Sequence, residues 1–222
     1  MATGAAQIIA DRSIGDLLSS LVRAEGSAGQ GYCASETLRR GPQASRNLAD
    51  AIHQLCALHG RHPGVVDFAL ERAATGSADW LLAAAAAFAE ERAYLTRLVV
   101  AAGPLPSTPG QAETEAAVIG QRHAIEMLAR SDRNGCALGA AAALIADWAA
   151  VREVLDLAAD RFGVEREPSM LPDEAVVRAA LAETAGSPAI ERAISFGAQQ
   201  ILVQHRGLWS LLEARAAARA AS

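Results

Sequence analysis

Residues 111–162 read QAETEAAVIGQRHAIEMLARSDRNGCALGAAAALIADWAAVREVLDLAADRF. Apolar side chains recur in this stretch at three- and four-residue intervals, which is the spacing of one face of an α-helix. The polar run SDRNG at 131–135 interrupts the pattern. We therefore predict two long helices, 111–130 and 136–162, joined by a tight turn. Each carries one polar side chain on or beside its apolar stripe, Gln121 in the first and Asp147 in the second.

The same spacing predicts two further long helices, at 79–102 and 188–217, and shorter helices after Ser13 and at 44–58, 63–74 and 172–186. Four long amphipathic helices are typical of a helical bundle. We therefore expect an all-α, single-domain helical bundle, with shorter N-terminal and connecting helices, that is compatible with a ferritin-like architecture. Residues 1–43 read as an N-terminal helical segment with a flexible link at 25–31, and residues 44–222 read as the bundle domain.

Composition and charge restrict the class of protein. The formal net charge is −5, and all 20 basic residues are arginines scattered among acids. Nucleic-acid binding needs a basic patch, so no nucleic-acid partner is expected. The apolar run at 83–89 is too short to span a membrane. The three cysteines are widely spaced, and residues 1–10 lack a signal-peptide layout. Both features favour a soluble cytoplasmic protein.

Four long helices each place one polar side chain on or beside the apolar stripe near mid-length. These residues are Glu91, Gln121, Asp147 and His205. A buried carboxylate is costly unless it is paired, protonated or bound to a metal, so we expect the four groups to converge. One interpretation is a small-ligand pocket that all four residues line. Another is a metal site in which Glu91, Asp147 and His205 hold iron or manganese.

The expected architecture resembles that of ferritin-like carboxylate proteins, which place Glu-x-x-His pairs on two of their helices. The sequence contains no Glu-x-x-His. Tyr94 stands where a histidine ligand would follow Glu91, and His123-x-x-Glu126 has the reverse order. The metal interpretation therefore lacks the motif of that class of protein.

The simpler interpretation is a structural polar network. Glu91 and Asp147 would then pair across helix interfaces with an arginine such as Arg152 or with His205, and Gln121 would bond a neighbouring backbone carbonyl. Of these interpretations, we favour the structural network.

Three further histidines lie close together in the sequence, His53, His59 and His62. His59 falls near the end of the stripe of helix 44–58, and the break at Gly60 separates it from His62. No carboxylate or thiol stands at ligand spacing, so helix-end and loop histidines are expected instead of a metal cluster.

No catalytic motif is present, neither a P-loop nor G-x-S-x-G. We therefore expect a protein that acts by binding or assembly, with a homodimer or a small molecule as partner and no membrane partner. The alternative is a ferritin-like or haem-oxygenase-like bundle with a metal or small-ligand pocket between the long helices.

Overall fold

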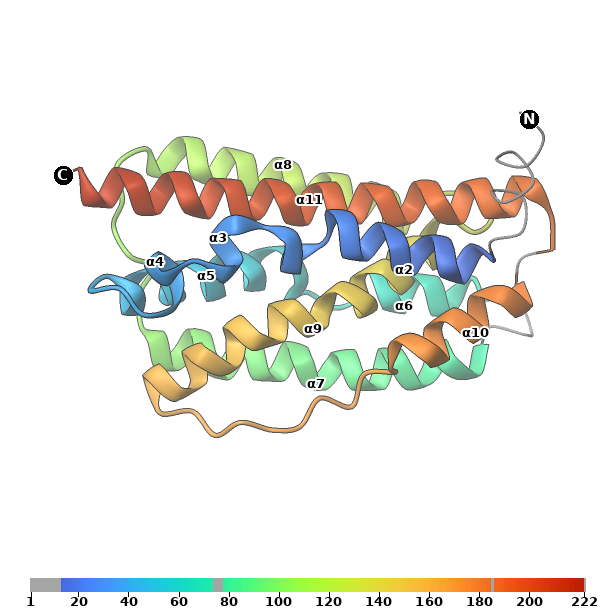
Figure 1. The fold of residues 1–222 in the computed structure, drawn as a ribbon, viewed down its shortest axis with the longest axis horizontal. Coiled ribbons are helices and arrows are strands. Elements are labelled where there is room, and N and C mark those ends of the chain that lie inside the picture. The colour runs from blue at the N-terminus through green and yellow to red at the C-terminus, as the bar shows by residue number, and fades with distance from the viewer. Residues whose placement is uncertain (1–12, 74–77, 185, 222) are drawn as a thin grey trace, which may run out of the picture.

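The computed structural model describes residues 13–73, 78–184 and 186–221, which form an all-α domain (Figure 1). The described residues contain no strand. Their elements are α2 (Ile14–Glu25), the 3-10 turn η1 (Ser27–Gly29), α3 (Gly31–Ala34), α4 (Glu36–Arg39), α5 (Ala44–His59), α6 (Val65–Glu71), α7 (Ala78–Ala102), α8 (Gln111–Ala129), α9 (Cys136–Phe162), α10 (Glu174–Thr184) and α11 (Pro188–Ala220). The predicted all-α class and the four long helices are confirmed.

Helix α9 runs through the centre of the fold. Every residue from Cys136 to Ile145 is buried, so this half of the helix is surrounded by other elements. Helix α11 packs closely along it. A Cβ atom on Gly139 would lie 2.0 Å from the carbonyl oxygen of Ile194, and one on Gly197 would lie 2.0 Å from that of Cys136. The two glycines therefore set how closely α9 and α11 approach.

The ends of several helices follow the capping chemistry of the sequence. The Asp16 backbone N–H donates to Ser13 Oγ at 3.1 Å, as expected for the start of α2. Gly163 ends α9 in the left-handed region, with φ 70°, as predicted for a C-terminal cap. Two helix starts differ from the prediction. Pro63 precedes α6 instead of lying in its first turn, and α10 begins two residues after Pro172.

The N-terminal elements lie against the bundle. Helix α2 packs on α10 and α11, and η1 packs on α9 and α11 (Figure 1). This places residues near 27 beside the middle of the two most closely packed helices. Residues 1–10, which lack a signal-peptide layout, and the helix break expected at residues 75–77 lie outside the described residues.

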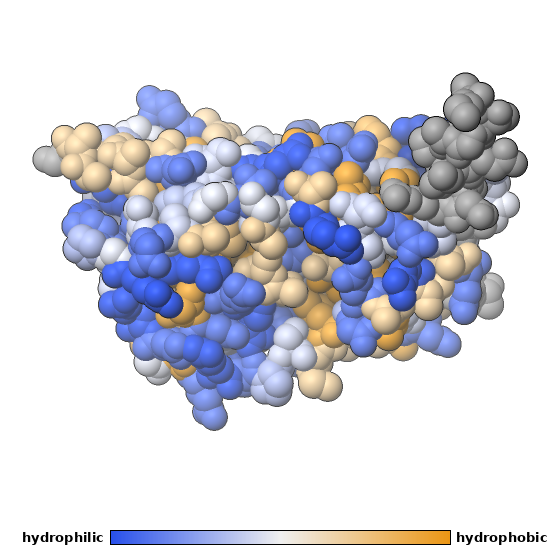
Figure 2. All heavy atoms as spheres, in the orientation of Figure 1, coloured by the Kyte–Doolittle hydropathy of each residue, from blue (hydrophilic) through white to orange (hydrophobic). Residues whose placement is uncertain are grey.

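The surface is mixed in character. Figure 2 shows hydrophobic atoms gathered where α2, α9 and α10 meet, while the end near α4 and the C-terminal part of α9 is mostly hydrophilic. Within the described residues, no helix is long and apolar enough to cross a membrane.

Candidate functional site

A chain of hydrogen bonds between buried ionisable side chains joins α9, α11 and α5. His205 Nδ1 lies 2.6 Å from Asp147 Oδ2, and His205 Nε2 lies 2.9 Å from His59 Nε2. All three residues are buried: Asp147 is 2% exposed, His205 is 1% exposed and His59 is 5% exposed. We call the series Asp147–His205–His59 the relay. It brings together two of the four residues predicted from the sequence.

Residue Ser27 holds the carboxylate end of the relay. Its backbone N–H donates to Asp147 Oδ1 and its hydroxyl donates to Asp147 Oδ2, each at 2.6 Å. The hydroxyl in turn accepts the indole N–H of Trp209 at 2.8 Å. A Cβ atom on Gly26 would lie 2.4 Å from Asp147 Oδ1, so only glycine lets the chain pass this closely. The link at 25–31, which the sequence leaves as a connection, thus supplies part of the buried network.

Hydrogen bonding and burial act in opposite directions on Asp147. Burial raises the pKa of this carboxyl. The hydrogen bond and charge of His205 and the two hydrogen bonds from Ser27 together lower the pKa by more than burial raises it, so the net pKa is below the ordinary value. Asp147 is therefore ionised at neutral pH. For His59, burial and the neighbouring His205 hold the pKa well below 6.5, so its ring is neutral.

Glu91 belongs to a second network that adjoins the relay without joining it. Its carboxylate accepts the indole N–H of Trp148 at 3.0 Å and pairs with Arg152 at 2.9 Å. Arg152 also pairs with Asp156 at 2.8 Å. The Trp148 ring packs edge-on against His59, with 5.5 Å between centroids. Glu91 is thus neutralised by its arginine and separated from the relay by an indole ring.

Gln121 lies apart from the other three predicted residues. It is half-buried on α8, and its Nε2 donates to the backbone carbonyl of Gln204 at 3.1 Å. It therefore contacts the chain one residue before His205 but not the imidazole. This contact is the one that the simpler interpretation of the sequence gives for Gln121.

The His59 end of the relay opens on a small hollow between α5, α6, α7, α8 and α9, with a volume of about 30 Å³. Its walls are mostly apolar, with Leu58, Val65 and Ile125 among the lining side chains. Among the described residues, no group bonds to His59 Nδ1. Within the part of the chain that the structure describes, it is the one side-chain polar atom of the relay without a protein partner.

Charged side chains also line this hollow. They are Arg61, Arg122 and Glu126. Arg122 lies 3.8 Å from Glu126 on the next turn of α8, whereas Arg61 has no ion-pair partner among the described residues. The lining therefore carries one more positive than negative charge.

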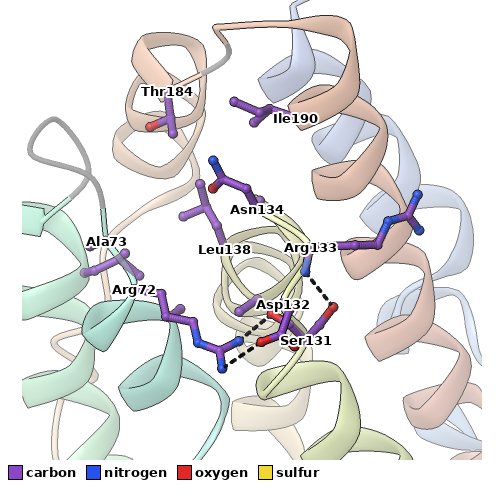
Figure 3. A pocket seen from close by; sticks show the side chains of 13 residues that line it. Arg72, Ala73, Ser131, Asp132, Arg133, Asn134, Leu138, Thr184 and Ile190 are labelled. Atoms are coloured by element: carbon purple, nitrogen blue, oxygen red, sulfur yellow. Dashed lines mark hydrogen bonds and ion pairs between the residues drawn. The ribbon is translucent and has the colours of Figure 1, made fainter.

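A larger hollow, of about 320 Å³, lies at the turn before α9 (Figure 3). Arg72 reaches across it and donates to the Ser131 carbonyl, and it lies 3.8 Å from Asp132 (Figure 3). The Arg72 guanidinium is thus already paired with residues that line the hollow. No member of the relay lines this hollow.

A second buried charge cluster ties the C-terminal end of α11 to α5. Asp50 is fully buried and pairs with Arg215 at 2.8 Å and with Arg219 at 2.7 Å. Asn47 and Thr108 accept further guanidinium hydrogen bonds. This cluster lines none of the hollows described above, so we interpret it as a structural tie.

Among the described residues, no group of three or more His, Cys, Asp or Glu side chains is placed to hold a metal ion. Glu91 is committed to Arg152, so the set Glu91, Asp147 and His205 does not converge on one point. The geometry instead defines a helical bundle with a buried Asp–His–His chain that ends at a small hollow.

Comparison with known proteins gives the family. Residues 22–220 match DUF6975, a family of unknown function, and the chain belongs to that family. No curated protein matches, and no solved structure matches.

Sequence reasoning missed two members of the network. His59 is the helix-end histidine that the sequence predicts, since it is the last residue of α5, but its contact with His205 was not predicted. Ser27 lies in a link of small and polar residues. The signal for His59 was its place near the end of the apolar stripe of α5. For Ser27 the local sequence holds no signal, because its partners Asp147 and Trp209 are more than 100 residues away.

Proposed function

We propose that this protein binds a small molecule in the hollow at His59, and that the relay sets the hydrogen-bonding character of that site. The observation that carries the proposal is the placement of His59. Its Nε2 bonds to His205, while its Nδ1 has no partner among the described residues and its ring lines the hollow. A ring nitrogen that has no protein partner, in a residue that lines a hollow, is open to a hydrogen bond from a molecule outside the chain.

The surroundings also support a binding site. Ligand sites are mostly apolar clefts with a few fixed polar groups, and this hollow has apolar walls and one oriented imidazole. The hydrogen bond from His205 to His59 Nε2 holds the His59 ring in place, and the Trp148 ring packs edge-on against it. The hollow is far too small for a porphyrin, so we propose a small ligand rather than a haem.

Ligand binding can be tested by following methyl and amide NMR signals of Val65, Ile125 and Leu144 during titration with formamide and methanol. We expect saturable shifts confined to these and neighbouring residues. The variant Ile125→Phe should abolish the shifts because the larger ring fills the hollow. The control Ile119→Phe, on the exposed side of the same helix, should leave them unchanged. Shifts that are absent, or that survive Ile125→Phe, contradict the proposal.

A second candidate function is assembly as a homodimer through α8 and α11. Four large apolar side chains are exposed on these neighbouring helices, namely Ile119, Met127, Phe196 and Val203. Two of them, Met127 and Phe196, line a shared surface hollow of about 310 Å³. Exposed apolar side chains gathered on one face are typical of interaction surfaces.

Light scattering after size exclusion tests this assembly. We expect a dimer that Met127→Glu disrupts, because a buried charge without a partner is costly. Val100→Glu serves as the control, since Val100 is exposed on α7 and this helix lies on the opposite side of the fold from α8 and α11 (Figure 1). A monomer at high concentration, or equal effects of the two variants, would exclude the α8–α11 dimer.

A further inference from the structure

The middle of α8 and most of α11 carry no acidic side chain. The chain holds 25 Asp and Glu residues, yet α11 has none between Glu191 and Glu213, and α8 has none between Glu115 and Glu126. The formal net charge is −5, so two copies repel each other least through a surface that lacks carboxylates. The exposed face of α8 and α11 is therefore suited to a contact between two copies of the chain.

The two helices lie antiparallel in this face. Arg215, near the end of α11, donates to Thr114 Oγ1, near the start of α8, at 3.0 Å. Gln121, further along α8, donates to the carbonyl of Gln204, which lies earlier in α11, at 3.1 Å. The start of α8 thus lies beside the end of α11, and the turn after α8 lies beside the start of α11.

One end of this face is bulky and basic. Phe196 and Met127 are exposed there, and the Arg133 guanidinium lies 5.3 Å from the centre of the Phe196 ring. Arg192 is exposed one turn before Phe196 on α11. We call these four residues the bulky end. It combines two large apolar side chains with two cations.

The other end is small and acidic. Gly120 on α8 and Gly207 and Ser210 on α11 are exposed, and a Cβ atom on Gly120 would meet no atom within 4 Å. Glu113 and Glu213 are exposed at the same end, where α8 starts and α11 approaches its last turns. We call these five residues the small end. It offers the space and the charge that the bulky end lacks.

The face is therefore complementary to itself when one copy is reversed. Val203 is exposed on α11, as far along the helix from Phe196 as from Ser210. We propose that two copies pack through α8 and α11 about a two-fold axis that crosses the helices at the level of Val203, so that the bulky end of each copy meets the small end of the other. This inference rests on the proposed homodimer and specifies its geometry.

This arrangement pairs large with small and positive with negative. Phe196 of one copy packs over Gly207 and Ser210 of the other, where the short side chains leave room for the ring. Arg192 of one copy lies opposite Glu213 of the other. Within the part of the chain that the structure describes, neither of these two charged residues forms an ion pair, so both can pair across the interface.

The other two-fold arrangement, with the axis along the helices, pairs like with like. It would place Phe196 against Phe196 and hold the glycines of the two small ends apart, which leaves a gap without packing contacts. It would also bring Arg192 of one copy to Arg192 of the other. Like charges that face each other across an interface weaken it, so this arrangement is disfavoured.

Charge reversal distinguishes the two arrangements. Arg192→Glu and Glu213→Arg each create two like-charged pairs in the proposed dimer, so either variant alone should raise the dimer dissociation constant about tenfold in sedimentation equilibrium. An equimolar mixture of the two variants should restore the parent value, because each supplies the charge that the other lacks. The control Glu165→Arg, in the exposed loop after α9 on the opposite side of the fold, should leave the constant unchanged (Figure 1).

Cysteine cross-linking gives a second, independent measurement. Val203→Cys should form a disulfide-linked dimer with its own copy on oxidation, because the axis passes at this residue. Phe196→Cys should cross-link to Ser210→Cys in a mixture but not to itself. The native cysteines are buried or half-buried, and the parent chain measures their background.

The outcomes separate the geometry from the dimer. If the mixture of charge variants binds no more tightly than each variant alone, or if Phe196→Cys cross-links to itself, the proposed arrangement is wrong and the dimer stands. If the parent chain stays monomeric at high concentration, the homodimer fails together with its geometry. The substituted residues are exposed in the single chain, and circular dichroism checks that each variant is folded.

Discussion

Removing the hydroxyl of Ser27 should destabilise the protein far more than an ordinary surface serine substitution. In Ser27→Ala, Asp147 loses a 2.6 Å hydrogen bond to a buried carboxylate, worth about 1.5–3 kcal/mol. The Trp209 N–H loses its acceptor and stays buried, which costs about 1–3 kcal/mol. The combined loss is about 4 kcal/mol, a large part of the stability of a typical domain. The backbone hydrogen bond from Ser27 to Asp147 remains.

Urea unfolding followed by circular dichroism measures this loss. The matched control is Ser20→Ala, which removes an exposed hydroxyl that bonds only the Asp16 carbonyl, and it should change stability by less than about 0.5 kcal/mol. Trp209→Phe should cost about 1–2 kcal/mol less in the Ser27→Ala background than in the parent chain, because the indole N–H is already unsatisfied there. Equal losses for Ser27→Ala and Ser20→Ala, or additive effects with Trp209→Phe, would refute this account of the network.

Three other substitutions or conditions test the packing and the buried charges. Asp50→Asn should cost about 3–5 kcal/mol in the free energy of unfolding by urea, since it leaves two buried guanidinium groups without their carboxylate; a loss below 1 kcal/mol contradicts the pairing. The pKa of His59 is held well below 6.5, so the unfolded chain takes up a proton there that the folded chain does not. Stability should thus fall by up to about 1.4 kcal/mol per pH unit below pH 6.5, and unfolding of His59→Gln should show a shallower pH dependence. Gly139→Ala should lower the melting temperature, because its Cβ atom would meet a carbonyl of α11 at 2.0 Å, whereas Gly120→Ala, with open space around it, should raise it slightly; the same change in both would show that α9 and α11 are not closely packed.

The helices were predictable because their signal is local. Apolar spacing placed α7, α8, α9 and α11 to within a few residues, and Ser13 and Gly163 marked helix ends by side-chain and backbone chemistry that acts over one turn. The starts of α6 and α10 were misplaced at prolines. A proline is tolerated in the first turn of a helix and equally well just before it. The sequence alone does not distinguish these two positions.

Part of the site was also predictable from periodicity. Asp147 and His205 lie on the inward faces of their helices, and a buried carboxylate requires a partner, so their contact follows from the stripes and from electrostatics. The same reasoning includes Glu91, which pairs with Arg152 as the simpler interpretation expects. It could not show that Gln121 is only half-buried, because a position on a helical wheel does not separate the core from its boundary.

What periodicity cannot show is which buried donors and acceptors satisfy one another across the fold. Two tryptophans of the long helices, Trp148 and Trp209, each bury an indole N–H that needs an acceptor. One finds Glu91 and the other finds Ser27. Because each buried indole N–H needs an acceptor, a count of these donors predicts a buried acceptor outside the helical stripes. The small polar residues of the 25–31 link are then candidates for that acceptor. The relay is therefore best understood from hydrogen-bond requirements summed over the whole core, because hydrophobic spacing positions Asp147 and His205 but does not complete their hydrogen bonds.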